Sequence, residues 1–100
     1  MPPKISFDRQ KLADFCQRWG ITELALFGSA LRDDFRADSD VDVLVTFAPD
    51  RDISFDKHMQ MLDELAAIFG REVDMVEKAN IRNPFRRHHI LTTKEVVYAA

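Results

Sequence analysis

The most constraining feature of the chain is a Gly-Ser pair followed, after a gap of ten residues, by two aspartates one position apart. Gly28 and Ser29 end one apolar run, and Asp40 and Asp42 open the next, in the stretch LFGSALRDDFRADSDVDVLVTF. Side chains alternate along a strand, so both carboxylates point to the same side. At about 5 Å and an effective dielectric constant near 20, their repulsion costs roughly 3 kcal/mol, and a divalent cation removes that cost.

The order of apolar and turn-forming residues predicts alternating helices and strands. We expect helices at 8–19, 30–35, 55–69 and 85–91, and strands at 24–27, 41–47 and 72–76, with a last short strand at 95–98. Asp8 or Ser6, Ser54 and Asn83 are expected N-caps, and Gly20 and Gly70 are expected helix ends. The predicted fold class is α/β (α+β), a small mixed sheet of three to four strands with helices packed against it.

Two amphipathic faces follow from this assignment. Leu12, Phe15, Cys16 and Trp19 form the apolar face of the first helix. The apolar face expected for the helix at 55–69 comprises Phe55, Met59, Leu62, Leu65, Ala66 and Phe69. We interpret both faces as core, and Cys16 as a small core residue.

The predicted strands bring a third acid to the same place. The strand at 72–76 follows the strand at 41–47 through one helix, so we expect the two to be neighbours, with Asp74 on the face that carries Asp40 and Asp42. Three carboxylates at one spot cannot all stay ionised without cations. In two-metal chemistry one ion activates the attacking oxygen and one steadies the leaving pyrophosphate, so Asp40 and Asp42 are expected to bind metal, and Asp74 to bind metal, act as general base, or both.

The Gly-Ser turn supplies the complementary half of such a site. Backbone N–H groups and the Ser29 hydroxyl, at the start of the helix expected at 30–35, suit a bound phosphate. Arg32 lies one turn further and can reach a triphosphate, although a surface arginine is as good an interpretation. Taken singly, each motif also fits an ordinary turn or a solvated strand residue; the combination is what predicts metal beside phosphate, the layout of nucleotidyl transfer.

Size and composition limit the remaining possibilities. One hundred residues predict one domain, 1–100, and an apolar fraction of 46% allows a real core. A net charge of −3 argues against nucleic-acid binding driven by bulk charge, so direct nucleic-acid binding is not expected. No apolar run is long enough to span a membrane, and a single Cys16 suits a reducing compartment, so we expect a cytoplasmic protein.

A basic segment stands out in this acidic chain. Arg82, Arg86 and Arg87, with His88 and His89, fall on or next to the short helix expected at 85–91. The interpretation as a solvated helix face competes with that of an anchor for an acidic surface, a nucleotide or RNA. Adjacent histidines point in different directions on a helix and do not form a zinc site alone.

On these residues the chain resembles the minimal nucleotidyltransferase (MNT) family of the DNA polymerase beta-like superfamily. The family pattern, Gly-Ser and then Asp-x-Asp, matches Gly28-Ser29 and Asp40-Val41-Asp42, and the third family acid matches Asp74 in EVDMVE. The tail IRNPFRRHHILTTKEVVYA is also similar to the family's C-terminal segment. The resemblance therefore covers nearly the whole chain and implies the nucleotidyltransferase fold.

The resemblance also implies a biological role. Members of the family are often antitoxins paired with a helical HEPN RNase toxin, and the implied reaction transfers AMP from ATP, with Mg²⁺, onto a tyrosine of that toxin. Two Mg²⁺ ions and a hetero-oligomer with the toxin are the implied cofactors and assembly. Two alternatives stay open at this point. One is an antitoxin that neutralises its partner by binding alone, and the other is a nucleotidyltransferase acting on a small molecule such as an aminoglycoside.

Overall fold

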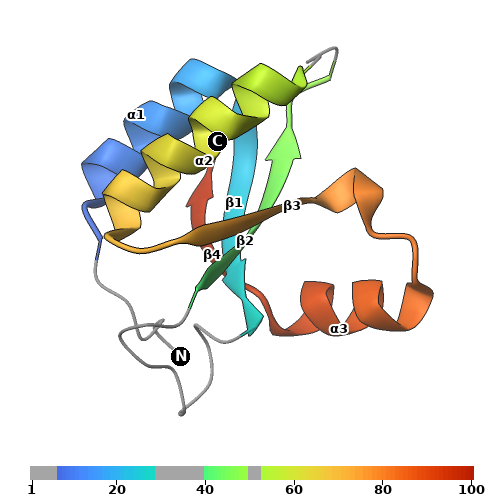
Figure 1. Ribbon diagram of the computed structural model, residues 1–100. Coiled ribbons are helices and arrows are strands. Elements are labelled where there is room, and N and C mark those ends of the chain that lie inside the picture. The colour runs from blue at the N-terminus through green and yellow to red at the C-terminus, as the bar shows by residue number, and fades with distance from the viewer. Residues whose placement is uncertain (1–6, 29–39, 50–52) are drawn as a thin grey trace.

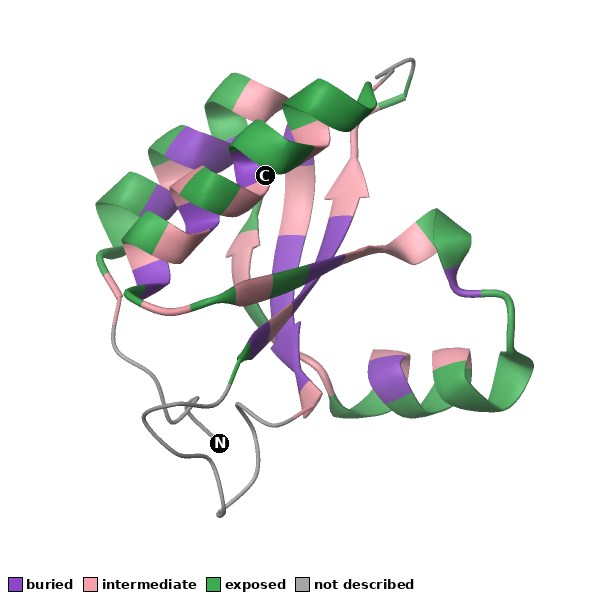
Figure 2. Cartoon of the chain, in the orientation of Figure 1, coloured by how far each residue is buried: buried purple, intermediate pink, exposed green. Residues whose placement is uncertain are grey.

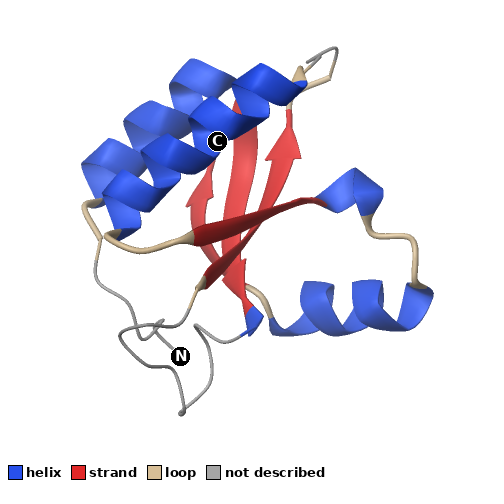
Figure 3. Ribbon diagram, viewed as in Figure 1, coloured by secondary structure: helices blue, strands red, loops and turns tan. Residues whose placement is uncertain are grey.

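The computed structural model describes residues 7–28, 40–49 and 53–100, and helices and strands are mixed along the chain (Figures 1 and 3). The strands are β1 (Ile21–Phe27), β2 (Val41–Phe47), β3 (Val73–Glu77) and β4 (Glu95–Ala99). The helices are α1 (Arg9–Trp19), α2 (Phe55–Phe69) and α3 (Pro84–Thr93), and a short 3-10 turn, η2 (Lys78–Asn80), follows β3. The predicted fold class is confirmed.

The four strands form one mixed sheet in the order β3-β2-β1-β4. β1 runs antiparallel to both of its neighbours, β2 and β4, whereas β2 and β3 are parallel. A parallel pair needs a crossover connection, and α2 lies within that connection. The prediction that the strands carrying Asp42 and Asp74 are neighbours is therefore confirmed.

Helices lie on both faces of the sheet. α1 and α2 pack side by side over one face, and α3 lies on the other (Figure 1). The larger core forms between the sheet and the first two helices, where Val41, Val43 and Val45 of β2 meet Leu12 and Leu65. A smaller core forms under α3; its buried residues are Ala25, Phe27, Leu44, Ile81 and Ile90. Figure 2 shows the buried positions concentrated along the two central strands.

The local signals in the sequence set the helix boundaries. The side chains of Asp8, Ser54 and Asn83 each accept hydrogen bonds from backbone N–H groups at the starts of α1, α2 and α3. Gly20 and Gly70 end α1 and α2 in the left-handed conformation, with φ of 73° and 71°. These caps are the predicted ones, because capping depends on residues that are neighbours in sequence.

The predicted apolar face of α2 is correct in part. Leu65 and Phe69 are buried as predicted, and Leu62 packs against the larger core. Phe55 is 76% exposed and Met59 is 44% exposed, so their assignment to the core is wrong, and Met61 is buried although it was not assigned. Sequence periodicity alone does not choose between overlapping apolar stripes on the first turns of one helix.

α1 and α2 are joined at their outer edge by one acid. The Glu64 carboxylate accepts a hydrogen bond from Trp19 Nε1 at 2.9 Å and forms an ion pair with Arg18. Trp19 also packs against the larger core, as expected for the fourth member of the α1 stripe.

The helix expected at 30–35 lies outside the described residues. In the described part of the chain no helix is both long and apolar enough to cross a membrane.

Cys16 is fully buried in the larger core, and burial raises the pKa of its thiol from 9.0 to about 12. Because the thiol pKa is higher in the folded state than in the unfolded state, the protonated thiol stabilises the fold. This contribution to the free energy of unfolding is complete below about pH 9 and is lost as pH rises towards 12. We expect the stability advantage of the wild-type chain over Cys16→Ala to shrink by roughly 1–2 kcal/mol between pH ~8 and pH ~10.5. Urea unfolding of both proteins measures this difference, and an advantage independent of pH would contradict the assignment.

Candidate active site

Asp42 and Asp74 lie side by side on the two parallel strands. The strand register makes their Cα atoms partners, and neighbouring strands lie about 4.8 Å apart. Both side chains project from the sheet face opposite the larger core, because Val41, Val43 and Met75, at alternate positions, point into that core. The structure thus brings two of the predicted acids together, while their chemical roles stay predictions.

Asp40 lies one residue before β2 and is exposed, as Asp74 is, whereas Asp42 is half-buried. The backbone around this acid is fixed to β3, since the Val41 N–H donates to the Glu72 carbonyl at 2.9 Å. Among the described residues, no three Asp, Glu, His or Cys side chains are already arranged to hold a metal ion. The predicted convergence of Asp40, Asp42 and Asp74 on one metal position is therefore not seen in this part of the chain.

Gly28 follows the end of β1 and lies beside Asp42. The register pairs Phe27 with Asp42, so Gly28 follows directly beside that acid. A Cβ atom on Gly28 would lie 2.5 Å from Oδ2 of Asp42, far inside van der Waals contact. Gly28 also has φ of 67°, in the left-handed region that favours glycine. Only a glycine at this position lets the Asp42 carboxylate stay where it is.

The other two predicted nucleotide-binding residues, Ser29 and Arg32, lie outside the described residues. Gly28 is the last described residue of the Gly-Ser motif.

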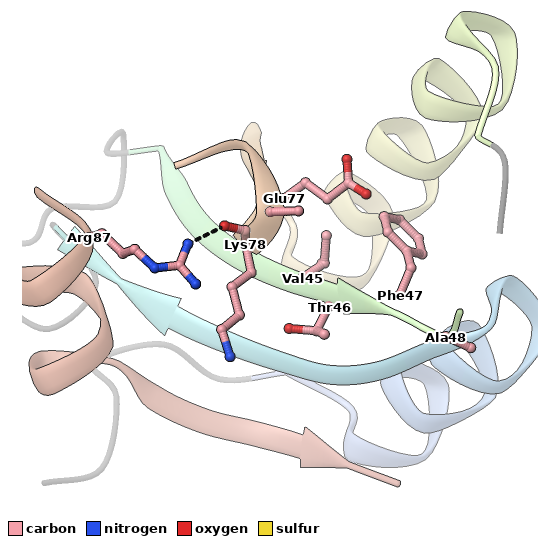
Figure 4. Close-up of a pocket in the computed structure, with 8 residues that line it drawn as sticks. Val45, Thr46, Phe47, Ala48, Glu77, Lys78 and Arg87 are labelled. Carbon is pink, nitrogen blue, oxygen red and sulfur yellow. Dashed lines mark hydrogen bonds between the residues drawn. The ribbon is translucent and has the colours of Figure 1, made fainter. Parts of the chain in front are cut away.

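The predicted basic segment forms α3 and the turn before it. Arg82, Arg86, His88 and His89 are exposed, whereas Arg87 is half-buried. Arg87 has a structural role: its Nη1 donates to the Lys78 carbonyl at 2.9 Å and so ties α3 to η2 (Figure 4). The two histidines are in successive positions on one helix, as expected.

A pocket of about 300 Å³ lies at the other end of β2 from the acids. It is lined by residues 45–48 and 77–79 and by Arg87 (Figure 4). Thr46 is four residues beyond Asp42 on the same strand face, which corresponds to roughly 13 Å. Leu44, buried under α3, stands between them. The pocket is therefore separate from the pair of acids.

Sequence reasoning missed two of these features. No sequence motif predicted the turn η2 or the pocket beside it, because Lys78 and Arg87 come into contact only in the folded chain. The contact between Gly28 and Asp42 was also missed, since Gly28 was interpreted as a phosphate-binding turn alone. The only available signal was that the glycine and the acid flank the same predicted sheet edge.

Comparison with known proteins agrees with this geometry. Residues 9–97 match the family described as nucleotidyltransferase domain. The protein adenylyltransferase MntA of Thermococcus cleftensis is 34% identical over 82 residues, which are 82% of this chain and 78% of that protein.

Two solved structures are similar in fold. One, provisionally named a minimal nucleotidyltransferase, has a TM-score of 0.68 and 31% identity, and the match covers 88% of this chain and 85% of that one. Another, a crystal structure of a toxin-antitoxin with AMP-PNP, has a TM-score of 0.72 at 17% identity, covering 93% and 74% of the two chains. The chain therefore belongs to the nucleotidyltransferase domain family and is an enzyme of its minimal, DNA polymerase beta-like branch.

Proposed function

We propose that this protein is an antitoxin that transfers AMP from ATP to a tyrosine hydroxyl of a cognate HEPN-type RNase toxin and thereby neutralises it. The observation that carries the proposal is the parallel register that places Asp42 beside Asp74. The similarity to a protein adenylyltransferase and to a toxin-antitoxin structure with AMP-PNP supports the acceptor class and the nucleotide.

The proposed reaction is a single displacement at phosphorus. The acceptor oxygen attacks the α-phosphorus of ATP, the bond from that phosphorus to the bridging oxygen of the β-phosphate breaks, and pyrophosphate leaves. Asp74 accepts the proton of the acceptor hydroxyl, for which its exposed position on an edge strand leaves access. Oxygen attack and pyrophosphate departure would therefore occur on the side of the sheet that carries α3, at its β3 edge.

Asp40 and Asp42 are the residues that would hold Mg²⁺, with Asp74 as a third ligand where two ions are bound. Bound Mg²⁺ supplies charge neutralisation for the triphosphate and the leaving pyrophosphate. Gly28, Ser29 and Arg32 would hold the phosphates, by backbone N–H groups, a hydroxyl and a guanidinium. Gly28, which has no Cβ atom, also leaves room for the Asp42 carboxylate.

The test is mass spectrometry of a candidate HEPN-type toxin, chosen from the neighbouring reading frames, after co-expression with the chain and after incubation with ATP and Mg²⁺. We expect AMP on a tyrosine and loss of RNase activity. A toxin that loses its activity without carrying AMP would replace this proposal with neutralisation by binding alone. Transfer to a small molecule in place of the toxin would contradict the assigned acceptor.

We expect ATP and Mg²⁺ to bind together better than either binds alone. The acids beside one another repel a triphosphate, and the phosphates in turn complete the coordination of the ion. Titration calorimetry should show ATP affinity at least about tenfold higher with Mg²⁺ than with a chelator present, in line with a coupling energy of about 1.4 kcal/mol. Equal affinity in both conditions would count against a metal site at Asp40 and Asp42.

A further inference from the structure

The outer side of α3 carries an exposed aromatic ring among basic residues. We define the α3 surface as Arg82, Phe85, Arg86 and His89. All four are exposed, and Phe85 is 85% exposed, the highest value among the large hydrophobic residues of the described chain. On α3, Phe85 and His89 are four residues apart and so share one side, while Ile90 points into the core under the helix.

The segment that contains this surface is strongly basic. Residues 78–94 hold five Lys and Arg and no Asp or Glu. The whole chain has 14 basic and 17 acidic residues, so the remainder holds nine basic and 17 acidic residues, a net charge of −8. The chain is therefore electrically polarised, with its excess of positive charge on and around one helix.

Some basic residues of this segment interact with other parts of the fold, and others do not. Lys94 forms an ion pair with Glu23, and Arg87 donates to the Lys78 carbonyl. Among the residues that the structure describes, no ion pair joins Arg82 or Arg86 to an acidic side chain. Both guanidinium groups remain available for a partner.

The α3 surface lies on the acid-bearing side of the sheet. α3 packs on Leu44, which projects from the same face of β2 as Asp42. The end of α3 leads directly into β4, whose Glu95 is the register partner of Leu26, two residues before Gly28. From there α3 extends away from the site for about 15 Å, the length of its ten residues. A protein bound at the acids can therefore reach the whole helix.

We propose that the α3 surface is the docking surface for the acceptor protein, and that the acceptor presents an acidic patch with an apolar pocket for Phe85. This inference rests on the proposed function for the identity of the acceptor. Phe and Arg are both enriched at protein interfaces, and Arg is also enriched among the residues that contribute most of the binding energy. Arg82 and Arg86, which form no ion pair with the described acids, favour negative charge opposite them, since a basic partner would be repelled.

A protein fits these observations better than RNA does. The −8 charge of the remaining chain repels a polyanion, and the acids Asp42 and Asp74 lie on the same face. Phe85 is the sole aromatic residue in 78–94, whereas single-stranded RNA is usually held on several stacked rings. RNA binding is kept as an outcome of the test.

The test measures binding of the candidate HEPN-type toxin to chains that carry Asp42→Asn, so that no reaction is needed for the readout. On this background we expect Phe85→Ala to weaken binding about 30-fold, and Arg86→Glu about tenfold with a smaller salt dependence. The matched controls are Phe55→Ala and Lys57→Glu on α2, which lies on the other side of the sheet. Phe55 is a similarly exposed aromatic residue, and Lys57 is an exposed basic residue. These controls should bind like the parent chain.

The outcomes separate this inference from the proposed function. Unchanged toxin binding by Phe85→Ala and Arg86→Glu would overturn the docking surface, even if wild-type chain adds AMP to the toxin. Loss of binding in both variants would support it, even if no AMP is transferred. A gel shift of single-stranded RNA that Arg86→Glu abolishes, with toxin binding intact, would assign the surface to RNA and overturn the inference. Phe85 and Arg86 are exposed, so neither change is expected to unfold the chain.

Discussion

We expect Asp42→Asn to lower AMP transfer at least about a thousandfold, because the substitution would remove the charge proposed to hold Mg²⁺ against the triphosphate, a contribution of several kcal/mol to the transition state. The fold should be unaffected or slightly more stable. Asn has the same shape, and the change removes the repulsion between Asp42 and its register partner Asp74. The measurement is the initial rate of AMP incorporation into the toxin, with thermal unfolding of the same sample.

The matched control is Asp63→Asn, which changes an exposed acid on α2, across the sheet from the site. This variant should keep the wild-type rate. An Asp42→Asn protein that still modifies the toxin at a comparable rate would contradict the metal-binding role. If the variant has lost both its activity and its unfolding transition, it is unfolded, and its inactivity does not support the metal-binding role. Both quantities are therefore measured on one sample.

Gly28→Ala has the second largest expected effect, and it acts through Asp42. The added methyl group would lie 2.5 Å from Oδ2 of Asp42, so the carboxylate must move away. Displacing a catalytic group by about 1 Å can cost on the order of a hundredfold in rate. The positive φ at this position adds a stability loss of roughly 1–2 kcal/mol, because an L side chain is strained there.

Gly70→Ala separates these two effects. Gly70 has φ of 71°, close to the 67° of Gly28, but no atom lies within 4 Å of the position that its Cβ would occupy. Both variants should therefore lose similar stability, while Gly28→Ala alone loses AMP transfer. Equal activity in the two variants would show that Asp42 tolerates the methyl group, and that its position is not set by Gly28.

The parts of the fold that were predictable depend on residues close in sequence. Caps at Asp8 and Ser54 and glycine ends at Gly20 and Gly70 were predictable because each acts within one helical turn. The meeting of Asp42 and Asp74 was predictable for a different reason. Alternation fixes which side of a strand each acid occupies, and a strand-helix-strand unit makes the two strands neighbours.

The parts that were missed depend on contacts between distant residues. β1 begins at Ile21, three residues before the predicted start, although Thr22 and Glu23 interrupt the apolar pattern. Their polar groups are satisfied across the sheet: the Thr22 hydroxyl donates to the Thr46 carbonyl, and Glu23 pairs with Lys94. The exposure of Phe55 has the same origin, because the rotation of α2 is set by the sheet below it.

The parallel pairing of β2 with β3 has a consequence for the time at which the protein becomes active. The Gly-Ser motif and Asp42 belong to the first half of the chain, but Asp74, the register partner of Asp42, is synthesised only after α2. β4, which flanks β1 on its other side, is synthesised later than β3. A growing chain therefore carries both motifs well before Asp74 can pair with Asp42, and the proposed site is assembled only after α2 and β3 have been synthesised.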